Sequence, residues 1–164
     1  MSPRVSSEQR NRSERGYSFS ELLVVMALIG LFVLFGGPSM ADAFRAYKVR
    51  SVANDLTTNL RAMRYNAVST RTPRVMTIND QANASPNQYS FTNYKGDPVT
   101  VRIEPGVNIE TTSPASITFN INGSTGATGS QTIAFSMFIS GSRSDRYTIT
   151  VTPTGTISSA YSTF

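Results

Sequence analysis

Apolar residues are continuous in the first quarter of the chain and periodic after it. The uninterrupted run Leu22–Phe35 begins directly after a single carboxylate, Glu21. A membrane-crossing helix needs about 20 residues, and the segment 17–40 supplies that length if its Gly-Gly-Pro sequence is tolerated. We expect Pro38 to kink this helix; the alternative is that it ends the helix.

Between residues 41 and 72, apolar positions recur mostly at steps of three and four, which predicts an amphipathic helix with one buried stripe. The stripe consists of Val49, Val52, Ala53, Leu56, Leu60, Met63 and Ala67. Thr72-Pro73 is expected to end the helix, because the residue before a proline disfavours the α region. The sequence therefore predicts one long helix, apolar all round at its start and one-sided at its end.

The segment 73–164 changes to short β-branched runs separated by Gly, Pro, Asn and Ser, which predicts antiparallel sheet with one buried face. The expected strands are Arg74–Asn79, Gln88–Asn93, Pro98–Ile103, Ile117–Asn122, Thr132–Ile139, Arg146–Thr152 and Thr156–Ser158. Alternation places Ile117, Phe119 and Ile121 on one buried face. The low-complexity stretch Asn122–Ser130 is expected to be flexible. The fold class is α+β, a long N-terminal membrane-spanning and amphipathic helix packed on antiparallel β-sheet.

Composition removes most enzyme classes. The chain contains neither cysteine nor histidine, so the usual zinc ligands and the Ser-His and Cys-His catalytic pairs are excluded. Asp80, Asp97 and Asp145 are expected singly in loops, which argues against a calcium site. We predict a protein that is not an enzyme, with no cofactor and no metal.

The formal net charge of +5 is not spread evenly along the chain. Four arginines in the polar segment 1–16 keep that segment cytoplasmic by the positive-inside rule and direct the β-rich part outward. They are Arg4, Arg10, Arg12 and Arg15.

A second basic group lies within an arc of about 80° beside the apolar stripe of the helix. It consists of Arg50, Arg61, Arg64 and Arg71. One interpretation is a surface that follows the phosphates of DNA. The favoured interpretation is a solvated flank whose long side chains lie over the sheet edge.

Glu21 is the most informative single residue. A carboxylate at the centre of a membrane helix costs about 2.5–3.5 kcal/mol, so such residues usually have a partner. The alternative is a carboxylate near a helix N-terminus, which the helix dipole stabilises by about 0.3–1 kcal/mol.

The N-terminal residues resemble a known family. Gly16, followed by an aromatic residue, with Glu21 at the fifth place and a Leu-Leu-Val-Val-Met core, resembles the class III signal peptide of type IV pilins and type II secretion pseudopilins. The C-terminal pattern ITF-x3-G, IAF and YTITVTPTG is similar to the globular domain of GspH/FimT-type pseudopilins and minor pilins.

This resemblance implies cleavage by prepilin peptidase between Gly16 and Tyr17, followed by N-methylation of Tyr17. Tyr17 departs from the phenylalanine that is usual there. The resemblance also supplies a partner for Glu21, the α-amino group of a neighbouring subunit. Further implied partners are other pilins or pseudopilins and the inner-membrane assembly platform. The protein would lie in the inner membrane as a single-pass subunit with its globular domain in the periplasm, and would then enter a filament.

The expected function is a structural minor pilin or pseudopilin at or near the tip of a type II secretion pseudopilus or type IV pilus. The first alternative is a DNA-binding minor pilin of a competence system. DNA-binding relatives carry a basic motif after the C-terminal glycine, and here that place reads Gly155-Thr156-Ile157-Ser158. A further alternative is a signal-anchored periplasmic binding module, intact at its N-terminus or cleaved after Ser39.

Overall fold

The structure is a computed structural model that describes residues 18–79 and 87–164, without the side chains of residues 34–39. The chain divides after Ser39 into two units, which are described separately. Gly16, Tyr17 and Asp80 lie outside the described residues, so the structure does not test the predictions that concern them.

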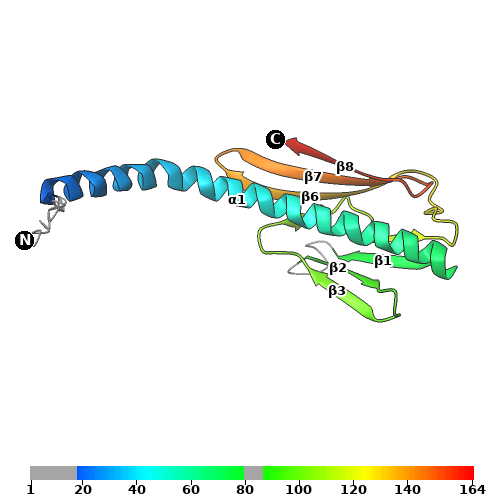
Figure 1. Ribbon diagram of the computed structural model, residues 1–164. Coiled ribbons are helices and arrows are strands. Elements are labelled where there is room, and N and C mark those ends of the chain that lie inside the picture. The colour runs from blue at the N-terminus through cyan, green and yellow to red at the C-terminus, as the bar shows by residue number, and fades with distance from the viewer. Residues whose placement is uncertain (1–17, 80–86) are drawn as a thin grey trace, which may run out of the picture. The chain divides into compact units, whose positions relative to one another are not determined.

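Helix α1 (Phe19–Thr70) is continuous over 52 residues (Figure 1). Its first turn is closed by the Ser18 carbonyl, which accepts the backbone N–H of Glu21 at 3.0 Å and of Leu22 at 3.1 Å. Because the helix runs through position 38, the alternative that Pro38 ends it is wrong; the kink stays a prediction. Among the described residues, no helix has the length and hydropathy that a membrane crossing requires, so the span expected over 17–40 is not confirmed.

The helix ends at Thr70, two residues before the predicted end, because Arg71 adopts a left-handed conformation with φ 50°. Glycine is the usual residue at this position after a helix, since a Cβ makes the left-handed region unfavourable by about 1–2 kcal/mol. Arg71 therefore holds a backbone conformation that suits another residue better.

Replacing Arg71 by glycine is expected to raise the free energy of unfolding by about 0.5–1 kcal/mol. Urea unfolding followed by circular dichroism measures this change. Arg71→Ala is the control, because it removes the same side chain and keeps the Cβ. Equal stability of the two variants would show that the left-handed residue carries no cost.

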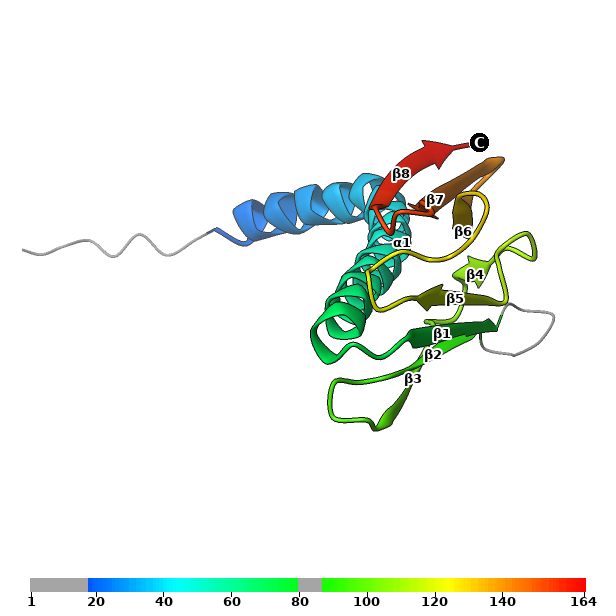
Figure 2. The same cartoon turned by 90° about the vertical axis from the view of Figure 1, so that its right-hand side faces the viewer.

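In the described residues 18–79 and 87–164, eight strands form two antiparallel four-stranded sheets (Figure 2). The first has the order β3 (Pro98–Arg102), β2 (Gln88–Thr92), β1 (Arg74–Asn79) and β5 (Ser116–Phe119). The second has the order β4 (Asn108–Ile109), β6 (Gln131–Ser140), β7 (Arg143–Val151) and β8 (Ile157–Thr163). The predicted antiparallel α+β arrangement is confirmed.

Four strands differ from the sequence-based prediction by two residues or more. β7 begins at Arg143, three residues before the predicted start at Arg146. β4 was not predicted, because two residues are too few to show alternation. β8 is longer than the expected Thr156–Ser158. β5 ends at Phe119, since the chain turns there and the Gly123 N–H donates to the Asn120 carbonyl at 2.8 Å. Ile121 is consequently 52% exposed, and its predicted place on the buried face is wrong.

The apolar stripe of α1 forms the centre of the core. Six of its seven predicted members are at most 1% exposed, and Val52 is partly buried. They pack with buried side chains of both sheets, including Met76, Phe119 and Phe135. Burying a side chain of this size stabilises the folded state by about 1.5–3 kcal/mol. The stripe therefore joins the two sheets through one helix face.

Tyr89 is the largest polar side chain in this core and is 1% exposed. Its hydroxyl accepts a hydrogen bond from Nδ2 of Asn59 at 2.9 Å. Burial raises the pKa of Tyr89, an effect that the Asn59 hydrogen bond partly opposes. The folded chain therefore keeps the phenolic proton to a higher pH than the unfolded chain does.

This difference predicts a loss of stability at alkaline pH. The contribution is fully present below the ordinary tyrosine pKa of about 10 and is lost as pH rises through the raised pKa of the folded state. Tyr89→Phe should lower stability at neutral pH by about 0.5–1.5 kcal/mol through the lost hydrogen bond, and should flatten the alkaline decline. Thermal unfolding across pH 8 to 11 measures this decline. Tyr94→Phe is the control, because Tyr94 is 68% exposed. An unchanged decline in Tyr89→Phe would contradict the assignment.

Candidate assembly segment and basic stripe

The start of α1 exposes large apolar side chains on all sides. Between Phe19 and Val33, eleven of them are between 49% and 79% exposed. They are Phe19, Leu22, Leu23, Val24, Val25, Met26, Leu28, Ile29, Leu31, Phe32 and Val33. A helix that is apolar all round is normally covered by lipid or by other protein. We call residues 19–33 the assembly segment.

Gly30 lies inside the assembly segment, and no contact within the described chain requires a glycine there. A Cβ built at this position meets no heavy atom within 4 Å. Glycine in an apolar helix allows the backbone of another helix to approach closely. The position is therefore open to contact with a helix of another chain.

Glu21 lies in the first turn of α1, at the start of the assembly segment. Ser18 and Glu21 have the Ser-x-x-Glu spacing of a capping box, but the Ser18 hydroxyl lies 2.8 Å from the Ser20 hydroxyl instead. Within residues 18–79 and 87–164, Glu21 forms no salt bridge. The helix dipole favours a carboxylate here, as the alternative interpretation expected, but this part of the chain supplies no cationic partner.

The four arginines predicted as a basic stripe do not form one free surface. Arg50 and Arg61 are exposed, and Arg71 follows the helix end. Arg64 is partly buried: its Nε donates to the Gly123 carbonyl at 3.1 Å, and its Nη2 donates to the Thr154 carbonyl at 3.4 Å. The guanidinium of Arg64 thus holds two loops against the helix.

These loops meet tightly at two glycines. A Cβ on Gly155 would lie 1.9 Å from the Gly123 carbonyl oxygen, and both glycines have positive φ. In the same place Thr125 is buried, and its N–H donates to the Pro153 carbonyl at 3.0 Å. We call Arg64, Gly123, Thr154 and Gly155 the Arg64 junction. Within the loop that was expected to be flexible, Gly123 and Thr125 are therefore buried and hydrogen-bonded.

Gly155→Ala is expected to destabilise the protein by more than about 2 kcal/mol, because the new Cβ overlaps a backbone oxygen and the φ is positive. Gly129→Ala is the matched control, since a Cβ there meets nothing within 4 Å. Chemical unfolding of both variants measures the difference. Similar stabilities would show that the junction adjusts without cost.

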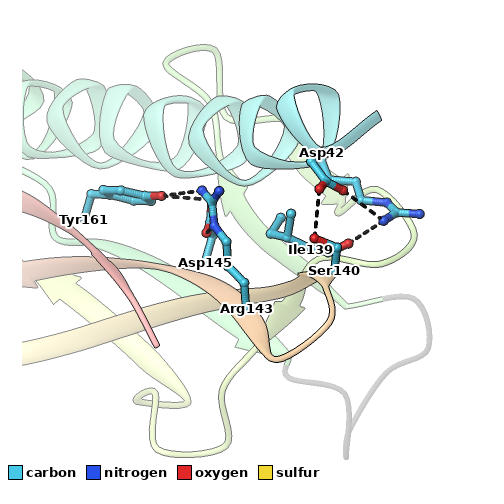
Figure 3. A network of polar contacts seen from close by, with 7 residues as sticks. Asp42, Ile139, Ser140, Arg143, Asp145 and Tyr161 are labelled. Atoms are coloured by element: carbon cyan, nitrogen blue, oxygen red, sulfur yellow. Dashed lines mark hydrogen bonds and ion pairs between the residues drawn. The ribbon is translucent and has the colours of Figure 1, made fainter. Parts of the chain in front are cut away.

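Asp145 was expected in a loop, and this expectation is wrong. It lies in β7, is fully buried, and accepts hydrogen bonds from Arg143 at 2.9 and 3.2 Å and from the Tyr161 hydroxyl at 2.9 Å (Figure 3). The hydrogen bond to Asp145 raises the pKa of Arg143. This cluster ties β7 to β8. The described residues contain no group of acidic side chains that could hold a metal ion.

A neighbouring polar cluster joins α1 to the β6–β7 hairpin. Asp42 pairs with Arg45 at 3.5 Å and accepts a hydrogen bond from the Ser140 hydroxyl at 2.8 Å (Figure 3). Arg45 also donates to the Ile139 carbonyl. Neither this cluster nor the Arg64 junction was predicted from the sequence. The sequence indicates only that Gly123 and Gly155 lie in turns, and not that these two turns meet.

A long helix packed through one face on antiparallel sheets, with an uncovered apolar start, defines a pilin-like subunit. The chain belongs to the family of the type II transport protein GspH, whose model matches residues 52–155. Members of this family are minor pilins or pseudopilins, which are structural subunits and not enzymes.

The type IV minor pilin FimU of Pseudomonas aeruginosa has a similar structure, with 15% sequence identity and a TM-score of 0.49. The similarity covers 68% of this chain and 87% of that chain. No curated protein matches the chain.

Proposed function

We propose that this minor pilin or pseudopilin enters its filament through Glu21, which pairs with the amino terminus of a neighbouring subunit. The observation that carries the proposal is the position of Glu21, at the start of an exposed apolar helix and without a cationic partner in the described chain. Bundled apolar helices would exclude water around this carboxylate. Its charge then favours a neighbour that presents a cation at the same level.

The amino terminus that would pair with Glu21 is created by cleavage. Prepilin peptidase would cut between Gly16 and Tyr17, and the new α-amino group of Tyr17 would then be methylated and would keep its positive charge. An uncut subunit has no such group, and a misplaced one leaves a buried charge unpaired, at a cost of about 3–5 kcal/mol. The pairing therefore selects processed subunits in the correct register.

The remaining steps of assembly are those that membership of the pilin family implies. Before assembly, the subunit would wait in the inner membrane, with the basic leader in the cytoplasm and the β-rich unit in the periplasm. The assembly platform would extract it into a secretion pseudopilus or a pilus. We place it at or near the filament tip, as a minor subunit that helps to start assembly.

The Glu21→Ala variant should be cleaved normally. The amount of it in filaments should be lower than that of the wild type by at least about tenfold, since removing one partner of a buried ion pair is strongly unfavourable. Immunoblots of sheared filaments and of membranes measure the two steps separately. Glu104→Ala is the matched control, because it removes an exposed surface carboxylate that pairs with Lys48. Normal incorporation of Glu21→Ala into filaments would contradict the proposed role of Glu21.

The DNA-binding alternative is not favoured by the geometry. Arg64, which lies between Arg61 and Arg71 in the predicted stripe, is engaged by two loop carbonyls. A surface that follows DNA phosphates needs free cations, whose binding weakens steeply as salt rises. We therefore assign Arg64 a structural role in this fold.

A further inference from the structure

Strand β8 is an edge strand without the usual protection. It ends the second sheet, and none of its seven residues is charged or proline. Six of the seven are exposed. Natural edge strands normally carry lysine, proline or a bulge that prevents another strand from pairing with them. β8 therefore presents an open set of backbone donors and acceptors.

The hydrogen-bond pattern shows which groups are open. Ser144 of β7 and Phe164 exchange two backbone hydrogen bonds, at 2.8 and 3.0 Å. Such pairs alternate along an antiparallel ladder with pairs that form no hydrogen bonds between the two strands. By the observed register, the N–H and C=O groups of Ser159, Tyr161 and Thr163 point away from β7.

The edge strand β3 of the other sheet is protected by contrast. Its ladder with β2 is anchored at one end by the Asn93 N–H, which donates to the Asp97 carbonyl at 2.9 Å. The same alternation directs Pro98, Thr100 and Arg102 to the open side. Proline has no N–H to offer, and Arg102 carries a charge. The edge strands β3 and β8 therefore differ in the way that strand addition requires.

A groove lies beside β8 on the helix side of the sheet. It has a volume of about 410 Å³ and is lined by Ala43, Ala46, Tyr47, Arg50, Tyr147 and Tyr161. Tyr147 and Tyr161 are register partners across β7 and β8, and their ring centres lie 5.1 Å apart. A strand added next to β8 would direct every second side chain to this side of the sheet.

Arg50 determines the charge of the side chain that the groove accepts. It is exposed, and within residues 18–79 and 87–164 it forms no salt bridge. A second copy of this chain that pairs through its own β8 fits poorly, because β8 offers no carboxylate to Arg50. An extended segment with an acidic side chain fits both the open edge and the cation.

We propose that β8 accepts an extended acidic segment of a partner protein as an additional strand, with the acidic side chain at Arg50 and its apolar neighbours against Tyr47 and Tyr161. The open backbone groups supply affinity, and the groove supplies specificity. This interaction is independent of Glu21, which lies in the other unit of the chain.

The test uses the full chain in detergent and an acetylated, amidated peptide of sequence TVTETVT. Binding is measured by fluorescence anisotropy of a labelled peptide. Ser159→Pro removes one outward N–H and should weaken binding by at least about tenfold, while the β7–β8 ladder stays intact. Thr100→Pro is the matched control, since it places proline at an outward position of β3, and it should change binding by less than about twofold.

Two further arms make the result specific. A TVTKTVT peptide should bind more weakly than TVTETVT, and Arg50→Ala should abolish that difference. If Ser159→Pro does not fold, a TVTETVT peptide methylated on every backbone nitrogen replaces it. This peptide has no N–H to donate to the open carbonyls of β8, and it should not bind.

Three results would overturn the proposal. The first is no saturable binding up to about 1 mM peptide. The second is equal binding by Ser159→Pro or by the methylated peptide. The third is a concentration-dependent dimer of the full chain that Ser159→Pro abolishes, which would assign the edge to a second copy. Filament incorporation of Glu21→Ala is unaffected by any of these results, so the two proposals fail separately.

Discussion

The folded part of this protein depends on the burial of one helix face. Val49, Ala53, Leu56, Leu60 and Met63 are buried on the same side of α1 and contact apolar side chains of both sheets. Without this face, two small four-stranded sheets would each expose an apolar surface. Two polar contacts add to this burial. Arg64 donates to the Gly123 carbonyl of a loop, and Arg45 donates to the Ile139 carbonyl near the end of β6, so both fix these segments against the helix.

The first half of the same helix has no corresponding partner in the described chain. The assembly segment is apolar all round, and a surface of this kind is normally covered by lipid or by other protein. We propose that Glu21 and Gly30 determine those contacts, since a buried carboxylate needs a cation beside it and a glycine permits the close approach of another helix. The helix thus has one half that builds the core of the domain and one half that is uncovered in the described chain.

The sequence predicted those features that depend on periodicity. The stripe on α1, the bounds of β1 and the antiparallel class were read correctly because 3.6- and 2-residue periods report which side is buried. The failures have two physical causes. Ile121 is exposed because a local turn at Asn120 ends β5 before it. Asp145 and the loop around Thr125 take their environments from residues farther along the chain, Tyr161 and Pro153. Local patterns carry no information on such contacts.

We propose that Glu21 recognises an amino terminus that exists only after cleavage at Gly16. The mass of the intact protein recovered from filaments, with fragmentation of its N-terminal peptide, tests whether that amino terminus is present. We expect a chain that begins at Tyr17 and carries one added methyl group on its α-amino nitrogen. A chain that begins at Met1, or one that begins at Met40 after cleavage behind Ser39, would contradict it.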